Sequence, residues 1–260
     1  MHADEPAGRW FGGGAAPAVP AGLRLFCFAH AGGGSAFFRP WRLAFGPRVE
    51  VRPVVLPGRE GRVRELPYRR MEQLLDPLCA ALAPHLDRPY AFFGHSLGAV
   101  LAYEVARRCS AGPGPGPVAV VVSGRRAPRL PNHRPLLSCL PDAEFLAAVG
   151  GLGGTPPEVL GEAQLIRLIL PALRCDFELN EAYQPLPGPR LRCPVAAYLG
   201  LDDPEATPAE MLGWRAETSG EFTLRLFTGD HFYLKGGRAD VRTALAADLD
   251  RAAGRSIDPD

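Results

Sequence analysis

The sequence Gly-His-Ser-Leu-Gly at residues 94–98 joins an apolar run to a helical pattern, and it constrains the fold more than any other stretch. Residues 89–93 predict a buried strand, and residues 97–109 predict a helix. A serine between a strand and a helix occupies a sharp, strained bend that exposes its hydroxyl, and the glycines let neighbouring backbone come close. Ser96 is therefore the candidate nucleophile; the alternative is a tight turn with a purely structural role.

Apolar and β-branched runs alternate with helical patterns on both sides of this turn. Predicted strands lie at residues 23–28, 49–56, 89–93, 118–123, 194–199 and 222–227. Predicted helices lie at residues 71–86, 97–109, 208–218 and 240–253, the first kinked or shortened by Pro77 and Pro84. This alternation predicts an α/β fold with a mostly parallel central sheet and helices on both faces.

Residues 129–189 interrupt the alternation. They contain no clear strand, but helical patterns occupy residues 142–149 and 163–183, and residues 150–157 are expected to form a flexible joint. We therefore predict a helical lid insertion at residues 129–189, lying over the active site. Its apolar side chains either line a substrate pocket or fill a small core of their own.

One main domain is expected from 260 residues of which 47% are hydrophobic. Residues 22–128 and 190–260 would form its core. Residues 1–21, rich in Gly, Ala and Pro, are expected to be a mobile N-terminal arm that Trp10 and Phe11 hold on the surface.

Charge and cysteine content exclude several classes of protein. The net charge of +1, from 29 basic and 28 acidic residues, argues against a general nucleic-acid binder. Six widely spaced cysteines without a Cys-x-x-Cys pair favour free thiols over a disulfide framework or a zinc site. The first 21 residues lack the pattern of a signal peptide, and no apolar run approaches the ~20 residues that span a bilayer. We expect a cytoplasmic monomer.

A glycine-rich loop follows the first predicted strand. Residues 29–35, Ala-His-Ala-Gly-Gly-Gly-Ser, lack the Gly-Lys-Ser/Thr ending of a phosphate-binding P-loop and the spaced glycines of a dinucleotide site. In a serine hydrolase of α/β type, this loop supplies one backbone N–H to the developing oxyanion, and the residue after the nucleophile supplies the other. Ala31 and Leu97 are the predicted donors, and His30 is expected to shape the loop.

A nucleophilic serine needs a base to accept its proton and an acid to orient that base. Among the six histidines, only His231 falls in a loop directly after a late strand, where the base follows the acid in this architecture. Asp202 and Asp203 both follow the strand at residues 194–199, and Asp203 is the favoured acid. Asp230 is expected to shape the loop of His231.

Several motifs together resemble the type II thioesterases, the stand-alone editing hydrolases that accompany polyketide synthases and nonribosomal peptide synthetases. They lie, in order, at residues 26–33, 56–59 (Leu-Pro-Gly-Arg), 93–99, 173–176 (Leu-Arg-Cys-Asp) and 229–232 (Gly-Asp-His-Phe). The chain is also similar to the medium-chain thioesterase of animal fatty acid synthesis. The resemblance covers residues 23–234 and departs at Ala29, where the family often has proline.

The resemblance implies an α/β-hydrolase fold with Ser96, His231 and Asp203 as the catalytic triad and the Ala31 and Leu97 amides as the oxyanion hole. It implies hydrolysis, through an acyl-enzyme, of acyl groups on the phosphopantetheine arm of acyl or peptidyl carrier proteins. The implied reaction needs no metal or cofactor, no nucleic acid and no membrane.

Carrier proteins are usually acidic, so arginines near the entrance are hypothesised to steer them. The candidates are either Arg59, Arg62 and Arg64 or Arg125, Arg126 and Arg129. Two alternatives remain open: a carboxylesterase or lipase that acts on oxygen esters, and a non-catalytic binding protein of the same fold. A binding protein of this kind normally lacks a triad member.

Overall fold

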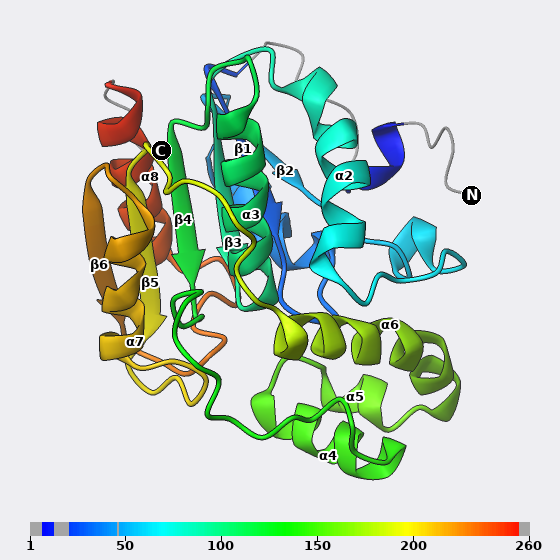
Figure 1. Cartoon of the computed structure of the whole chain (residues 1–260). Helices are drawn as coiled ribbons and strands as arrows, with labels where there is room; N and C mark the ends of the chain where they lie inside the picture. The colour runs from blue at the N-terminus through cyan, green and yellow to red at the C-terminus, as the bar shows by residue number, and fades with distance from the viewer. Residues whose placement is uncertain (1–6, 13–20, 46, 255–260) are drawn as a thin grey trace.

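A single parallel sheet organises the computed structural model, which describes residues 7–12, 21–45 and 47–254 (Figure 1). Its strands lie in the order β2-β1-β3-β4-β5-β6, and all neighbours are parallel. They are β1 (Leu23–Phe28), β2 (Val49–Pro53), β3 (Tyr90–His95), β4 (Ala119–Ser123), β5 (Val195–Gly200) and β6 (Phe222–Phe227). The predicted parallel sheet is confirmed. The strand order reverses between β1 and β3, and ligands of such sheets bind beside the carboxyl ends at that point.

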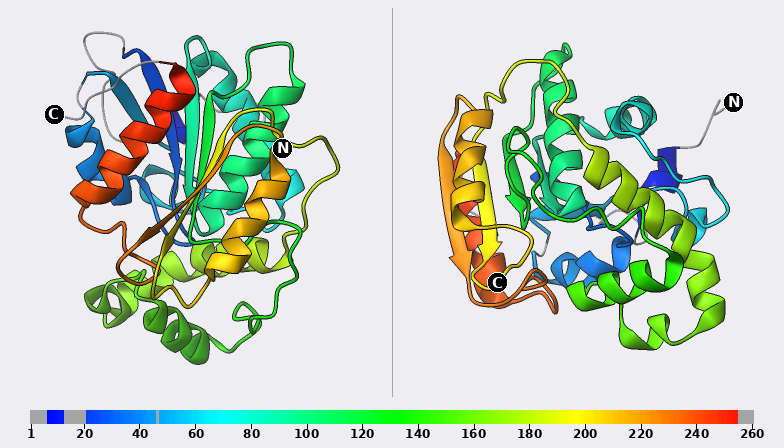
Figure 2. Two further views of the ribbon diagram at one scale, coloured as in Figure 1. Left: turned by 90° about the vertical axis from the view of Figure 1, so that its left-hand side faces the viewer. Right: turned by 60° about the horizontal axis from the view of Figure 1, so that its bottom comes forward.

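Helices cover both faces of the sheet, as predicted (Figure 2). One face packs against α2 (Met71–Leu82), α3 (Leu97–Ala111) and α7 (Pro208–Leu212). The other packs against α1 (Arg39–Ala44) and α8 (Ala239–Ala253). Burial on both faces explains why β1, β3, β4 and β5 are buried at every position rather than at alternate ones.

Several element boundaries differ from the predicted ones. Helix α2 contains Pro77 but ends at Leu82, and the 3₁₀ turn η4 (Ala83–His85) with Pro84 follows it. The last turns of the predicted helix at residues 208–218 form the 3₁₀ helix η5 (Gly213–Glu217). Helix α1 and the preceding 3₁₀ turn η2 (Ser35–Phe38) were not predicted, because six helical residues are too few to show a clear period.

The segment after β4 is helical and lies beyond the carboxyl ends of the strands (Figure 1). It contains α4 (Asp142–Leu152), α5 (Pro157–Leu160) and α6 (Ala163–Ala182). The predicted joint at residues 150–157 was partly wrong, since α4 continues through Gly150 and Gly151 to Leu152 and is capped by Gly153 in the left-handed conformation. Phe145, Val149, Leu173 and Phe177 form a small core within the segment. In the described part of the chain, no helix is both long and apolar enough to cross a bilayer.

The described part of the predicted N-terminal arm packs on the core. Trp10 ends the 3₁₀ turn η1 (Ala7–Trp10) and is 2% exposed, and the guanidinium of Arg62 lies 4.0 Å from the centre of its ring. Phe11 forms an antiparallel bridge with Val54, beside the edge strand β2. These contacts agree with the expected role of both aromatic residues. The rest of the predicted arm, residues 1–6 and 13–20, lies outside the described residues.

Candidate active site

The turn between β3 and α3 exposes one residue. Ser96 has φ 57° and ψ −117°, a conformation that residues other than glycine rarely adopt, so the turn is strained. Ser96 alone escapes burial in the stretch from Tyr90 to Arg107, all of which is described. A Cβ atom at Gly94 would collide with the backbone of Gly98, and one at Gly98 with the carbonyl of Phe28. The two glycines therefore allow the close approach that forms the turn.

The loops after β5 and β6 bring an acid and an imidazole together. Both carboxylate oxygens of Asp203 lie 2.9 Å from Nδ1 of His231. The side chain of His231 is 4% exposed, and that of Asp203 is fully buried. The backbone N–H of Glu205 donates to Oδ1 of Asp203 at 2.7 Å, which holds the carboxylate in place. Asp202, the other predicted acid, is exposed.

Asp230 does not take the position of the acid. Its Oδ1 accepts a hydrogen bond from the backbone N–H of Phe232 at 2.8 Å, so it shapes the loop as expected.

His231 lies against the serine turn. Its ring centre is 4.7 Å from that of His95, the residue before Ser96. A Cβ atom on Gly124, directly after β4, would approach Cε1 of His231 to 3.1 Å. The backbone carbonyl of Ser123, the last residue of β4, accepts a hydrogen bond from the backbone N–H of Ser96 at 2.8 Å. The imidazole therefore reaches the same edge of the sheet as the serine.

His95 is held in the core rather than in the site. It is fully buried, and its Nδ1 lies 2.9 Å from Oγ of Ser123, which also bonds the Tyr233 hydroxyl at 2.7 Å. Burial, followed by the neighbouring His231 and His30, lowers the pKa of His95 well below its ordinary value. A buried neutral imidazole of this kind supports the loop packing around His231.

The two predicted oxyanion donors belong to a tight turn and a helix start. The backbone N–H of Gly33 donates to the carbonyl of His30 at 2.9 Å, and Gly32 has φ 75°. This is the pattern of a type II turn with Ala31 at its second position. Leu97 begins α3, where backbone N–H groups have no helical partner and the helix dipole is positive. Both positions suit an oxygen that gains negative charge.

His30 is a buried neutral side chain. Burial, followed by electrostatic repulsion from the neighbouring His231, Lys235 and Arg59, lowers its pKa from 6.5 to about 3. Its ring packs edge-on against Phe37 and Phe232, each 4.8 Å away between centres. These contacts fit the expected loop-shaping role.

Protonation of His30 is expected to make the fold sensitive to acid. Folded His30 binds a proton only near pH 3, whereas the same histidine in the unfolded chain binds one below about pH 6.5. A falling pH therefore favours the unfolded chain, and the free energy of unfolding decreases. Between pH 7 and pH 5 the free energy of unfolding should fall by about 2 kcal/mol from this group alone. Urea unfolding across this range should give a shallower pH dependence for His30→Gln. His133→Gln, which changes an exposed histidine, is the control variant. Equal pH slopes for wild type and His30→Gln would contradict the prediction.

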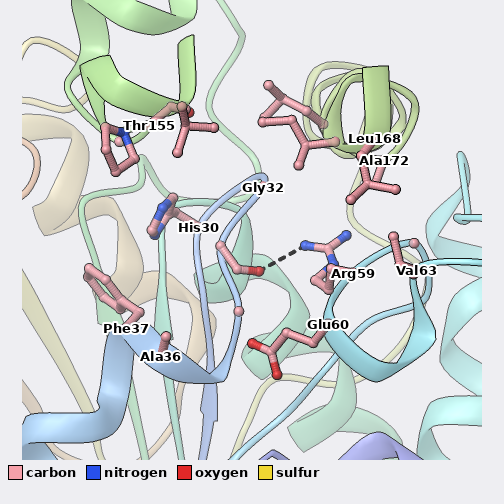
Figure 3. Close-up of a pocket in the computed structure, with 18 residues that line it drawn as sticks. His30, Gly32, Ala36, Phe37, Arg59, Glu60, Val63, Thr155, Leu168 and Ala172 are labelled. Carbon is pink, nitrogen blue, oxygen red and sulfur yellow. Dashed lines mark hydrogen bonds between the residues drawn. The ribbon is translucent and has the colours of Figure 1, made fainter. Parts of the chain in front are cut away.

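A cavity of about 530 Å³ begins at His30 and runs beneath the helical segment (Figure 3). Its walls come from the glycine-rich loop, the loop around Arg59, and apolar residues of α5 and α6. The helices contribute Val159, Leu168, Ile169, Ala172 and Leu173, and the loop around Arg59 contributes Val63. Ser96 and His231 do not line it, but Phe232 packs on His30 and connects the two sites. The volume falls within the roughly 300–1,000 Å³ of ordinary ligand pockets.

The structure corrects the hypothesis that six arginines steer a partner. Four of them have largely buried side chains: Arg59, Arg62, Arg125 and Arg126. Burial lowers the pKa of Arg125 to about 9, and its guanidinium donates to the Asn180 carbonyl of α6. These four arginines hold loops together and cannot meet a partner. Arg64 and Arg129 are exposed, and Arg129 pairs with Glu217 at 3.2 Å.

Sequence reasoning missed one contact at the site. Arg59 forms a two-pronged ion pair with Asp176 of α6, although 117 residues separate them. Both residues lie in motifs that the sequence singles out, at 56–59 and 173–176, but no spacing rule relates the two motifs.

A parallel sheet with a strained serine turn after β3 and a histidine loop after the last strand defines a serine hydrolase of the α/β-hydrolase fold. Comparison with known proteins identifies the family within that class. Residues 23–252 match the thioesterase domain family, and the chain belongs to this family.

Relatives and solved structures support the same membership. Thioesterase PikA5 of Streptomyces venezuelae is 42% identical over 219 residues, which cover 84% of this chain and 78% of that protein. The gramicidin S biosynthesis protein GrsT of Aneurinibacillus migulanus is 37% identical over 212 residues, covering 82% of this chain and 83% of that protein. The structure of BorB, a type II thioesterase from the borrelidin biosynthetic cluster, matches with a TM-score of 0.82 at 37% identity, covering 96% of this chain and 98% of that one.

Proposed function

We propose that this thioesterase hydrolyses acyl groups from the phosphopantetheine arm of acyl or peptidyl carrier proteins in polyketide or nonribosomal peptide biosynthesis. The observation that carries the proposal is the buried hydrogen bond between Asp203 and His231 beside the serine turn, in a chain of the thioesterase family. Relatives named for gramicidin S biosynthesis and for cadicidin biosynthesis support the substrate class.

The proposed reaction uses Ser96, His231 and Asp203 as nucleophile, base and orienting acid. Asp203 holds the proton of His231 on Nδ1, which leaves Nε2 to accept the proton of the Ser96 hydroxyl. The serine oxygen attacks the thioester carbonyl, and the protonated imidazole then donates its proton to the departing thiol. Water, activated by the same imidazole, hydrolyses the acyl-enzyme in the second half-reaction.

The negative charge of each tetrahedral intermediate needs fixed donors. The backbone N–H groups of Ala31 and Leu97 serve this purpose in the proposed mechanism. Removal of one such donor in a protease costs about 10²–10³-fold in kcat, so the loop of Ala31 is expected to make a large contribution to the rate, though a smaller one than a triad residue. The positive end of the α3 dipole acts in the same direction at Leu97.

The cavity under α5 and α6 is the proposed acyl site. Its walls are mainly apolar, which suits a hydrocarbon chain, and it opens beside the turn that carries Ala31. In this proposal the helical segment is the lid that separates the acyl chain from water. Arg64 and Arg129, the exposed members of the arginine set, are the remaining candidates for steering an acidic carrier.

A parallel assay tests the substrate class. The purified protein is given the same acyl group as an acyl-carrier thioester, as a thioester of a short pantetheine mimic, and as a p-nitrophenyl ester. We expect the largest kcat/KM with the carrier-bound thioester. A much larger kcat/KM with the oxygen ester than with either thioester would instead identify an esterase.

A further inference from the structure

Three motifs singled out in the sequence have no part in the triad, yet they meet at one carboxylate. Asp176 of the 173–176 motif lies on α6, Arg59 belongs to the 56–59 motif, and Gly32 belongs to the glycine-rich loop. Oδ2 of Asp176 accepts from the backbone N–H of Gly32 at 2.7 Å and from Nη1 of Arg59 at 2.8 Å. Oδ1 accepts from Nη2 of Arg59 at 2.7 Å. One side chain of the helical segment therefore binds both loops.

The pair also holds the far side of the turn. Nη1 of Arg59 donates to the carbonyl of Gly33 at 3.0 Å, the hydrogen bond drawn in Figure 3. The side chains of Arg59 and Asp176 are 10% and 3% exposed. Because the pair is bidentate and shielded from water, it fixes geometry more strongly than an exposed ion pair does.

The Arg59–Asp176 pair affects the conformation of the turn at residues 30–33, which carries the N–H of Ala31. Ala31 and Gly32 are the central residues of the turn, and the peptide between them presents its N–H to Asp176. Type I and type II turns differ chiefly in the orientation of this central peptide, so the carboxylate selects the type II form. The turn also closes through the His30 carbonyl, which shares a rigid peptide plane with the N–H of Ala31. Asp176 on the Gly32 N–H and Arg59 on the Gly33 carbonyl brace the residues that close the turn, so loss of both contacts weakens the hold on the peptide that carries the Ala31 N–H.

We propose that Asp176 and Arg59 are positioning residues that orient the Ala31 N–H toward the oxyanion only while α6 is seated on the core. The proposal rests on the proposed function, since it takes Ala31 as an oxyanion donor. It makes the seating of the helical segment a condition for transition-state stabilisation and not only for acyl binding. Displacement of α6 removes the acceptor from Gly32 and the partner from Arg59 in one step.

The test compares Asp176→Asn with wild type, because asparagine keeps the shape but loses the charge. We expect kcat for a short-chain thioester to fall about 10²-fold, as for loss of an oxyanion donor, with KM changed less than about threefold. Affinity for an alkyl boronic acid, which forms a tetrahedral adduct with the serine, should fall by a similar factor. Affinity for the free carboxylic acid product should not. A merely structural role would not separate these two affinities.

Glu178→Gln is the matched control. Glu178 lies two residues further along α6 and also joins the helical segment to the core, through an exposed ion pair with Arg69 at 2.7 Å. This pair does not contact the glycine-rich loop, so kcat and both affinities should stay within about twofold of wild type. Arg59→Lys keeps a charge opposite Asp176 but loses the planar, two-pronged guanidinium, so its kcat should lie between those of Asp176→Asn and Glu178→Gln. Arg59→Lys carries the test if Asp176→Asn does not fold.

Three results separate failure of the proposed function from failure of the role of the pair. Activity that persists in Ser96→Ala would overturn the proposed function itself. Activity that depends on Ser96, together with unchanged kcat and boronic acid affinity in Asp176→Asn, or in Arg59→Lys where that variant carries the test, would overturn only the role of the pair. An equal loss of both affinities would also overturn it, because the pair would then support the site in general.

Discussion

Ser96→Ala is expected to lower kcat for thioester hydrolysis by about 10⁴-fold or more. In the proposed mechanism, the variant lacks the atom that forms the acyl-enzyme, while the proposed oxyanion donors and the proposed acyl cavity remain. Because the turn holds Ser96 by backbone geometry and its side chain is partly exposed, alanine should leave the fold intact. Thiol release from a carrier-bound thioester, followed with a thiol-reactive dye, measures the change.

Ser110→Ala provides a matched control for the serine. Ser110 lies on the same helix, α3, and is exposed far from the turn, so its removal should leave kcat within about twofold of wild type. A Ser96→Ala enzyme that retains more than a hundredth of wild-type kcat, with contaminating activity excluded, would show that another group is the nucleophile.

Asp203→Asn is expected to produce the second largest effect, a loss of about 10⁴-fold in kcat. The same substitution costs about this much in a serine protease, because an amide stabilises the wrong tautomer of the histidine. Here the carboxylate is fully buried and both of its oxygens lie 2.9 Å from Nδ1 of His231, so no water can replace it easily. Steady-state kinetics with a short-chain thioester provide the measurement, with circular dichroism to establish folding.

The neighbouring residue supplies the control and resolves the two candidates from the sequence. Asp202 is exposed, so Asp202→Asn should change kcat less than about twofold. The opposite ranking of the two variants would assign the acid to Asp202. An acid at Asp202 would require the loop after β5 to rearrange during catalysis.

The strands of the sheet were predictable because the pattern that marks each strand lies within its own few residues. Strands buried on both faces need a continuous apolar sequence, and residues 90–93 of β3 and the three valines of β4 show it clearly. Helices α3 and α8 each run for 15 residues, and their predicted bounds agree with the structure within a few residues. Short elements such as α1 and α5 have too few residues for a period, and helix capping decided where α4 ended.

The candidate site was predictable where it depends on chain order. A serine turn after a central strand and a histidine after the last strand follow from the architecture, so Ser96 and His231 were chosen from sequence. Asp202 and Asp203 were not separable, because adjacent residues share every local signal. The arginine hypothesis failed for Arg59, Arg62, Arg125 and Arg126, since charge alone does not reveal whether a side chain is paired and buried.

The amino-acid sequence by itself determined the order of strands and helices, the strained turn at Ser96 and the family to which the chain belongs. Only the tertiary structure decided which carboxylate meets His231 and which partner Arg59 takes on α6. Apolar periodicity and turn chemistry act over a few residues, whereas these contacts join segments 28 and 117 residues apart. Their geometry depends on how the sheet, its loops and the helical segment pack together, which no local pattern records.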